Sequence, residues 1–229
     1  YYYLIEEYLC GESLYARIER TGSLQTGELI RLGIELCRIM NYLHSFKPNP
    51  ILYLDLHPGN LLICREQLKL IDFDQAALAS LSQERSVCYG TKGFAAPEQY
   101  EGGTLDERTD IYAIGALLYY MGTGHAPEGE IKAGQGSCRG DLYILMGRCL
   151  RIEKKERCQS VREVLEALEK LEARIFAERH IPLLRIAAAG SRSGIGVTHT
   201  ALGAVRYLRQ KGVSCLYREQ NVTGAVRRL

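Results

Sequence analysis

The spacing of apolar residues along the chain predicts a short strand followed by a long buried helix. Tyr1 to Ile5 is a run of aromatic and branched apolar residues, which is typical of a strand. From Thr26 to about Phe46, leucines and other apolar residues recur at helical intervals and form a wide stripe, so this helix should lie against the core. Pro48 and Pro50 then end the helix, because proline disrupts a helix interior.

Four further segments show helical patterns. A short one runs from Glu12 to Arg20, and Thr109 to Met121 is apolar nearly all round, which predicts a buried central helix. Asp141 to Leu150 is a second short helix. Ser160 and Glu163 have capping-box spacing ahead of the last apolar repeat, so a helix should begin there. The pattern therefore predicts a mostly helical region.

Three polar residues stand at the edges of short, strand-like apolar runs. Asp55 follows one such run, Asn60 lies five residues later, and Asp72 lies inside the run Leu70 to Phe73. An acid, an amide and a second acid suit phosphoryl transfer, with Asp55 as the base and Asn60 and Asp72 as magnesium ligands. The alternative is an ordinary turn, because Asp, Pro, Gly and Asn are also common turn residues.

Composition restricts the function only modestly. The 229 residues are 46% apolar, which allows one or two domains, and the net charge of +2 gives no indication of nucleic-acid binding. The eight cysteines form no CxxC pair, so we expect reduced thiols in a cytoplasm. No apolar run approaches the ~20 residues needed to span a bilayer, and no membrane segment is expected.

Four ordered motifs resemble the C-terminal lobe of a bacterial, Hanks-type Ser/Thr protein kinase. They are Tyr53 to Asn60, the run around Asp72, Gly90 to Glu98, and Asp110 to Gly115. The resemblance covers about residues 1–170 and implies an α+β protein-kinase-like fold with ATP and Mg²⁺ as cofactors and proteins as substrates. It places the end of the N-lobe and the hinge in residues 1–11, the C-lobe in 12–170, and a linker helix in 171–182.

The same resemblance implies roles for individual residues. The carbonyl of Glu7 and the amide of Leu9 would hold the adenine, and Leu62 would form the apolar floor beneath it. The hydroxyl of Thr91 would bridge the catalytic acid and its neighbouring donor, and His57 would donate to the transferred phosphate.

Two further contacts implied by the resemblance concern the fold. Glu98 would form a buried ion pair with Arg157. Asp110 would anchor the backbone near Tyr53 and Leu54, so that it sets geometry without touching the substrate.

The chain also departs from the family pattern. Tyr53 and Leu54 replace the usual His and Arg, His57 replaces a Lys, and Asp74 replaces the Gly of Asp-Phe-Gly. These changes motivate a pseudokinase, or ATP-sensing scaffold, as one alternative. The string DLHPGN also resembles aminoglycoside and choline phosphotransferases, whereas Ala-Pro-Glu ending at Glu98 favours a protein kinase.

The first residue is not Met, and the chain opens inside a strand-like run. We therefore expect the glycine-rich loop, the phosphate-binding Lys and its Glu partner to lie upstream of Tyr1. On this expectation, kinase activity belongs to the full-length protein and the 229-residue chain alone is inactive.

Residues 183–229 show the start of a different, βαβ layout. A buried strand at Leu183 to Ala189 precedes the glycine-rich turn Gly190 to Thr198 and a helix to about Gly212. A parallel strand is expected at Ser214 to Tyr217. The layout is that of a phosphate-binding loop in an α/β domain.

This stretch resembles the ParA/MinD family of ATPases, with one important loss. Arg192 stands at their signature Lys, but Val197 occupies the place of the Lys that contacts the phosphates. We expect a degenerate, structural or regulatory domain, which includes regulation of the preceding kinase lobe.

Overall fold

The computed structural model describes residues 8–82, 90–128, 140–179, 204–205, 207, 218–220 and 226–228. The chain divides into two compact units, residues 1–179 and 180–229. The elements of the first unit, in chain order, are β1 (Glu12–Ser13), α1 (Leu14–Thr21), α2 (Thr26–His44), β2 (Ile51–Leu52), the 3-10 turn η1 (Pro58–Asn60), β3 (Leu61–Cys64), β4 (Gln67–Leu70), β5 (Ala77–Leu78), α3 (Ala79–Ser82), α4 (Pro97–Glu101), α5 (Glu107–Thr123), α6 (Gly140–Cys149), the 3-10 turn η2 (Lys154–Glu156) and α7 (Val161–Arg179). The first unit is thus a mixed α+β structure in which helices predominate.

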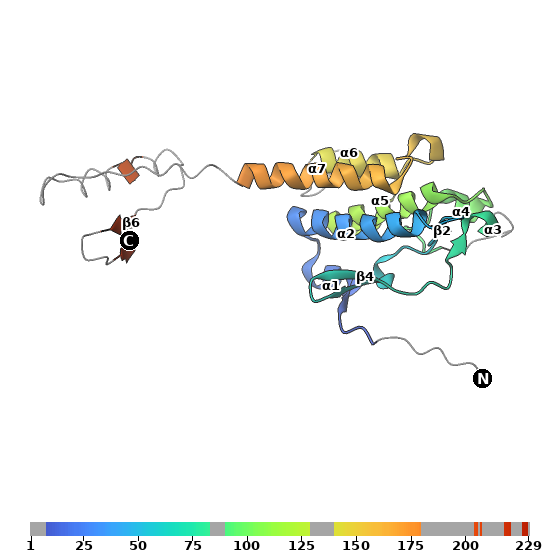
Figure 1. The fold of residues 1–229 in the computed structure, drawn as a ribbon, viewed down its shortest axis with the longest axis horizontal. Coiled ribbons are helices and arrows are strands. Elements are labelled where there is room, and N and C mark those ends of the chain that lie inside the picture. The colour runs from blue at the N-terminus through green and yellow to red at the C-terminus, as the bar shows by residue number, and fades with distance from the viewer. Residues whose placement is uncertain are drawn as a thin grey trace, which may run out of the picture. The chain divides into compact units, whose positions relative to one another are not determined.

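Helix α2 lies at the centre of the first unit. It runs between α7 on one side and α1 and β4 on the other, with α5 alongside (Figure 1). Its apolar stripe is buried, and α5 is buried on nearly every face, as the sequence predicts. Leu171 and Ile175 of α7 are also buried in this core, so one face of this part of α7 packs against it.

Two small antiparallel sheets position the polar residues of interest. Strands β1, β3 and β4 form one sheet, and β2 pairs with β5 in the other. In the register of β3 and β4, Leu61 lies opposite Leu70, and the amide of Ile71 donates to the carbonyl of Asn60 at 3.0 Å. This pairing brings Asn60 next to the segment that carries Asp72.

For the helix predicted over Glu12 to Arg20, the predicted first residue is wrong. Glu12 and Ser13 instead form β1, opposite Ile63 and Leu62, and the helix begins at Leu14. The Ser13 hydroxyl accepts from the amide of Ala16 at 3.1 Å, so Ser13 is the cap of α1. The helical periodicity of the segment did not reveal this cap.

The other predicted helices are found with shifted ends. Helix α2 ends at His44, before Phe46, and α5 begins at Glu107 because Asp106 caps it. At α7, the Ser160 hydroxyl accepts from the amide of Glu163 at 3.2 Å. The Glu163 carboxylate in turn accepts from the amide of Gln159 at 2.8 Å.

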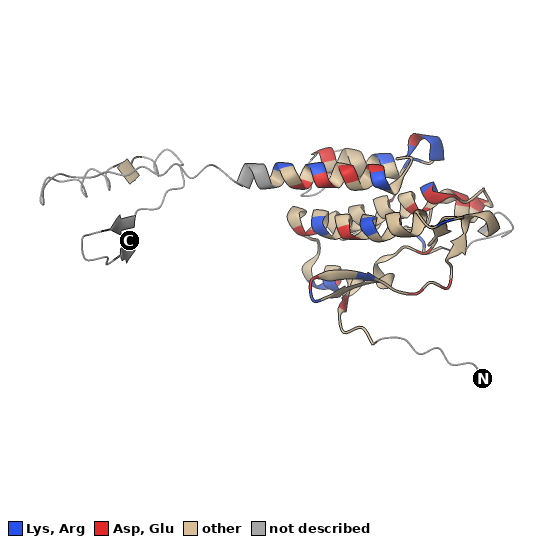
Figure 2. Cartoon of the chain, in the orientation of Figure 1, with Lys and Arg blue, Asp and Glu red and all other residues tan. Residues whose placement is uncertain are grey.

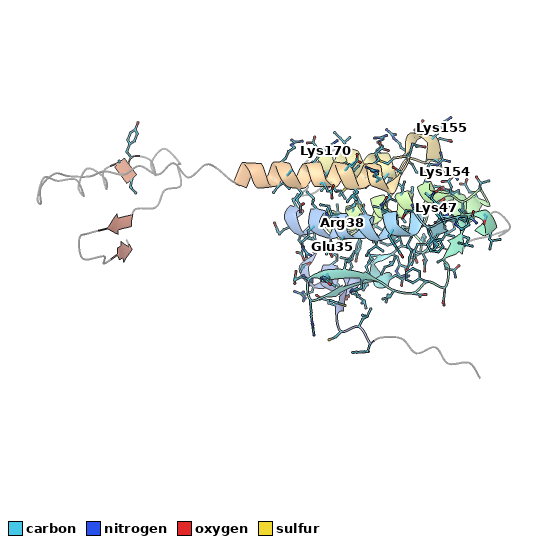
Figure 3. All side chains as sticks on the ribbon, in the orientation of Figure 1. Glu35, Arg38, Lys47, Lys154, Lys155 and Lys170 are labelled. Carbon is cyan, nitrogen blue, oxygen red and sulfur yellow. The ribbon has the colours of Figure 1, made fainter. Side chains whose placement is uncertain are left out.

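Acidic and basic residues are interspersed along α2 and the described part of α7, in keeping with the small net charge (Figure 2). Two of the residues labelled in Figure 3 show how such side chains join elements. Arg38 of α2 pairs with Glu169 of α7 at 3.0 Å, and the Glu35 carboxylate accepts from the amide of Leu68 in β4 at 2.7 Å. Polar contacts therefore fix α2 to both of its neighbours.

In the second unit, residues 204, 205 and 207 are helical, and β6 (Arg218–Gln220) pairs antiparallel with β7 (Val226–Arg228). The predicted phosphate-binding loop, residues 190–198, and the predicted strand, residues 214–217, lie outside the described residues. The degenerate ATPase domain over 183–229 therefore stays a prediction. Within the described ranges, no helix is long and apolar enough to cross a membrane.

Candidate active site

Asp55 is the centre of a cluster of polar side chains drawn from separate elements. The Thr91 hydroxyl donates to Asp55 Oδ1 at 3.0 Å. The Asn60 amide nitrogen lies 3.1 Å from the Asp55 carbonyl and 3.4 Å from Asp55 Oδ2. The contact expected between Thr91 and Asp55 is thus present, and both carboxylate oxygens are engaged.

His57 is oriented by its own backbone neighbour. Its Nδ1 accepts from the amide of Gly59 at 3.1 Å, and its Nε2 lies 3.7 Å from Asp55 Oδ2. Because Nδ1 is an acceptor, the ring carries a hydrogen on Nε2. A donor from His57 therefore points into the same space as the Asp55 carboxylate.

The two predicted magnesium ligands lie on adjacent segments. Asn60 is buried at the end of η1, and Asp72 is exposed just beyond β4. The Asn60 nitrogen faces Asp55, which leaves its amide oxygen for a cation, and Asp72 Oδ1 accepts from the amide of Asp74 at 3.2 Å. Amide and carboxylate oxygens fit Mg²⁺, which commonly takes one or two protein ligands together with substrate phosphates.

Tyr53 makes a contact that the sequence did not reveal. Its hydroxyl lies within hydrogen-bond distance of the carbonyls of Ile71 and Asp72, the latter at 2.7 Å, and its one hydrogen is shared between them. Its ring meets Phe73 edge-on at 5.3 Å, as expected of a packing residue. Burial raises the pKa of Tyr53, so the hydroxyl keeps its proton at neutral pH. The only signal in the sequence was a tyrosine at the position of the usual His.

Asp110 fixes the backbone just before Asp55 through hydrogen bonds. Its carboxylate accepts from the amides of Tyr53 at 2.9 Å and Leu54 at 2.8 Å, which confirms the predicted anchoring. His44 Nε2 lies 2.8 Å from the same carboxylate. The side-chain amide of Gln99 fixes the same backbone segment by donating to the carbonyl of Leu54 at 2.8 Å.

The loop that carries Thr91 is packed closely, both within itself and against α4. A Cβ at Gly90 would lie 2.3 Å from the Cβ of Ala95 and 2.9 Å from the side-chain nitrogen of Gln99 in α4, so only glycine fits there. The predicted ion pair between Glu98 and Arg157 is confirmed, and both residues are buried. It is bidentate: the two terminal nitrogens of the guanidinium donate to the two carboxylate oxygens at 2.7 and 2.8 Å. This pair fixes α4 to the segment before α7.

Asp106 forms a second electrostatic link in the same region. Its carboxylate pairs with Arg108 at 2.7 Å and with Lys154 at 2.9 Å, and Lys154 is labelled in Figure 3. Burial of the carboxyl raises its pKa, but hydrogen bonds from the two cations outweigh this effect and lower the pKa to about 2. Asp106 therefore stays charged throughout the ordinary pH range.

The predicted adenine site is described only in part. Glu7 lies outside the described residues, and Leu9 is half-buried. Leu62 is half-buried in β3, between the buried Leu61 and Ile63, so it belongs to the opposite face of the sheet from theirs. The roles of these residues in binding adenine stay predictions.

Comparison with known proteins gives one consistent result. Residues 1–180 match the model of the protein kinase domain. The chain is 29% identical over 204 residues to integrin-linked protein kinase 1 of Arabidopsis thaliana, an alignment that covers 83% of this chain and 42% of that protein. It is 28% identical over 205 residues to serine/threonine-protein kinase A of Synechocystis sp., covering 76% of this chain and 39% of that protein. The chain thus spans less than half the length of these relatives.

Proposed function

The chain belongs to the protein kinase family, and we propose that the full-length protein transfers the γ-phosphate of ATP to Ser or Thr hydroxyls of proteins. Its distant relatives include Ser/Thr protein kinases of bacteria and plants. The proposal assigns Asp55, His57, Asn60, Asp72 and Thr91 to the site of phosphoryl transfer. Their arrangement supports these roles as follows.

Asp55 acts as the base in this proposal. The substrate hydroxyl gives its proton to the Asp55 carboxylate while its oxygen attacks the γ-phosphorus, and ADP leaves from the opposite side. Thr91 and Asn60 hold the carboxylate at 3.0 and 3.4 Å, so it is oriented before the substrate binds. The Nε2 hydrogen of His57 is a donor for the phosphate in transfer.

Asn60 and Asp72 would hold Mg²⁺ through their side-chain oxygens. The ion supplies positive charge against the phosphates when it is bound. The hydrogen bonds from Tyr53 to the carbonyls of Ile71 and Asp72 fix the second ligand relative to the Asp55 stretch. Leu9 and Leu62, together with Glu7, would hold the adenine.

The main observation in favour of a protein substrate is the hydrogen bond from the Thr91 hydroxyl to the Asp55 carboxylate at 3.0 Å. It shows that the loop ending in Ala-Pro-Glu, at Glu98, extends up to the carboxylate that would accept the substrate proton. The ion pair of Glu98 with Arg157 holds that loop in place. A loop fixed beside the base favours an extended polypeptide acceptor over a small molecule.

The test is transfer of labelled γ-phosphate by the full-length protein, with Asp55→Asn as the inactive variant. Asp141→Asn is the control, because it removes an exposed carboxylate of α6 that pairs with Arg174 of α7. Protein acceptors and a panel of small hydroxyl compounds are offered together. Label on protein that disappears only in Asp55→Asn supports the proposal, and label on a small compound alone identifies a small-molecule kinase.

A second candidate is an ATP-binding scaffold without turnover. It is favoured by Leu54, which is buried at the place of the usual Arg, so no phosphate clamp exists there. Asp74 in place of the permissive Gly points the same way. Tight ATP binding by the full-length protein, with no label on any acceptor, would establish this second function.

A further inference from the structure

Three buried cysteines gather in the core away from the Asp55 site. Cys37 lies in α2, Cys149 is the last residue of α6, and Cys158 lies between η2 and α7. The Cys149 thiol donates to the sulfur of Cys158, and the two sulfurs are 3.9 Å apart. Phosphoryl transfer as proposed uses none of these thiols.

Helix α6 packs closely against α5 at Cys149. A Cβ at Gly115 of α5 would lie 2.5 Å from the Cβ of Cys149, so the absence of a side chain there lets α6 approach α5. Cys158 lies outside regular helix, between η2 and α7. The sulfurs have to move from 3.9 Å to the ~2.0 Å of a disulfide.

We propose that Cys149 and Cys158 are a dithiol that hydrogen peroxide converts to a disulfide, which closes the segment that presents Arg157 to Glu98. Cys158 directly follows Arg157 in the chain. The guanidinium of Arg157 donates to the carbonyls of Arg151 at 2.7 Å and Ile152 at 2.9 Å, both inside the segment 149–158. The disulfide would thus close a loop that contains Arg157 and these two acceptors.

The chemistry proceeds in two balanced steps. The Cys158 thiolate attacks one peroxide oxygen, the O–O bond breaks, and the released hydroxide takes a proton to give water. The Cys149 sulfur then attacks the sulfenic sulfur of Cys158, the S–S bond forms, and the second oxygen leaves as water. Two thiols are oxidised and one peroxide is reduced.

The order of the two sulfurs follows from their hydrogen bond. Donation from the Cys149 thiol lowers the pKa of Cys158, and the same hydrogen bond, with burial, raises the pKa of Cys149. Cys158 is therefore the attacking thiol and Cys149 the resolving one. Both side chains are buried, so the oxidant reaches them during opening of the 149–158 segment, and oxidation is slower than that of an exposed cysteine such as Cys10.

The disulfide has a structural consequence beyond its own ends. The closed segment has fewer open conformations, so Arg157 leaves Glu98 less often. Since Glu98 belongs to α4, slower opening should extend to Pro97–Glu101. The oxidised protein should therefore be the more stable form.

The test treats the full-length protein with hydrogen peroxide, blocks remaining thiols, and maps disulfides by mass spectrometry of proteolytic peptides. We expect a cross-linked pair of peptides containing Cys149 and Cys158 with a loss of two hydrogens. The link should form in the Cys37→Ala control, which removes a thiol of the same cluster, and be absent in Cys158→Ala. Oxidation should raise the thermal midpoint by several degrees and slow hydrogen exchange in 150–160 and in α4, in the wild type and the control only.

Several results would overturn the inference. One is the absence of this link under conditions that oxidise Cys10, and another is a link from Cys158 to Cys37 or to any other cysteine. A link accompanied by a lower midpoint would overturn the stabilising role. The wild-type measurement needs no variant to fold, and none of the three readouts depends on phosphoryl transfer, so failure here is distinct from failure of the proposed kinase function.

Discussion

Replacing Asp110 by Ala should destabilise the first unit strongly and loosen the Asp55 stretch. The carboxylate is buried and accepts from two buried backbone amides, at Tyr53 and Leu54, while His44 contacts it at 2.8 Å. Each buried amide left without an acceptor costs about 1–3 kcal/mol. Losing one member of a buried polar pair, here Asp110 with His44, typically costs about 3–5 kcal/mol. The amide estimate and the pair estimate describe the same carboxylate and are not added, so we expect a total loss of about 3–5 kcal/mol in the free energy of unfolding.

The assay is thermal unfolding combined with hydrogen exchange. For a unit of this size, 1 kcal/mol corresponds to about 2–4 °C, so Asp110→Ala should lower the midpoint by roughly 6–20 °C. Asp110→Asn keeps one acceptor oxygen, so it should lower the thermal midpoint by about half as much as Asp110→Ala. Exchange at the amides of Tyr53 and Leu54 should accelerate in both variants.

Glu107→Gln is the matched control, because Glu107 is an acidic residue in the same first turn of α5. If Asp110 acted only through the helix dipole, the two positions would be equivalent, each with an effect of about 0.3–1 kcal/mol. A midpoint for Asp110→Ala that equals that of Glu107→Gln would refute the reasoning. Unchanged exchange at Tyr53 and Leu54 would do the same.

Three further predictions concern the surrounding contacts. Arg157→Ala leaves Glu98 buried without its partner and should cost about 3–5 kcal/mol in a denaturant titration, and a cost below about 1 kcal/mol would contradict a structural role for the pair. The pKa of Asp106 is about 2 in the fold against 3.8 ordinarily, so its stabilisation is complete above about pH 4 and is lost as pH falls towards 2. Because the carboxylate is partly exposed, the loss should be at most about 2 kcal/mol, and it should be missing in Asp106→Asn. Thr91→Val should slow transfer while Thr91→Ser restores it, because Ser keeps the hydroxyl bond to Asp55; equal rates for the two would exclude that bond from the mechanism.

Local pattern and motif spacing were enough to predict most of the helical frame. The stripe of α2 and the all-round apolar character of α5 depend on residues close in sequence, and both were found. The contacts of Asp110 and of Glu98 with Arg157 were predicted from resemblance, because they join residues far apart in the chain. Periodicity alone contains no information about such pairs.

Where sequence reasoning failed, a tertiary contact decided the local structure. Glu12 and Ser13 fit a helical pattern, yet pairing with Leu62 and Ile63 makes them a strand, and Ser13 then caps α1. The extra bonds of Tyr53 were missed for a similar reason. A tyrosine among apolar residues is expected to be a core residue, and the partners of its hydroxyl lie 18 and 19 positions away in the sequence.

The backbone at Leu54 and Asp72 shows why Tyr53 and Asp110 matter together. Both Leu54, with φ of 67°, and Asp72, with φ of 62°, adopt the left-handed conformation that is costly for residues other than glycine. Leu54 is held there through its amide by Asp110 and through its carbonyl by Gln99, and the carbonyl of Asp72 is held by the Tyr53 hydroxyl. Such strain persists only where surrounding contacts enforce it, so part of the stability of the fold is used to hold Leu54, just before Asp55, and Asp72 in these conformations. Tyr53 thus joins the backbone just before Asp55 to the backbone of Asp72.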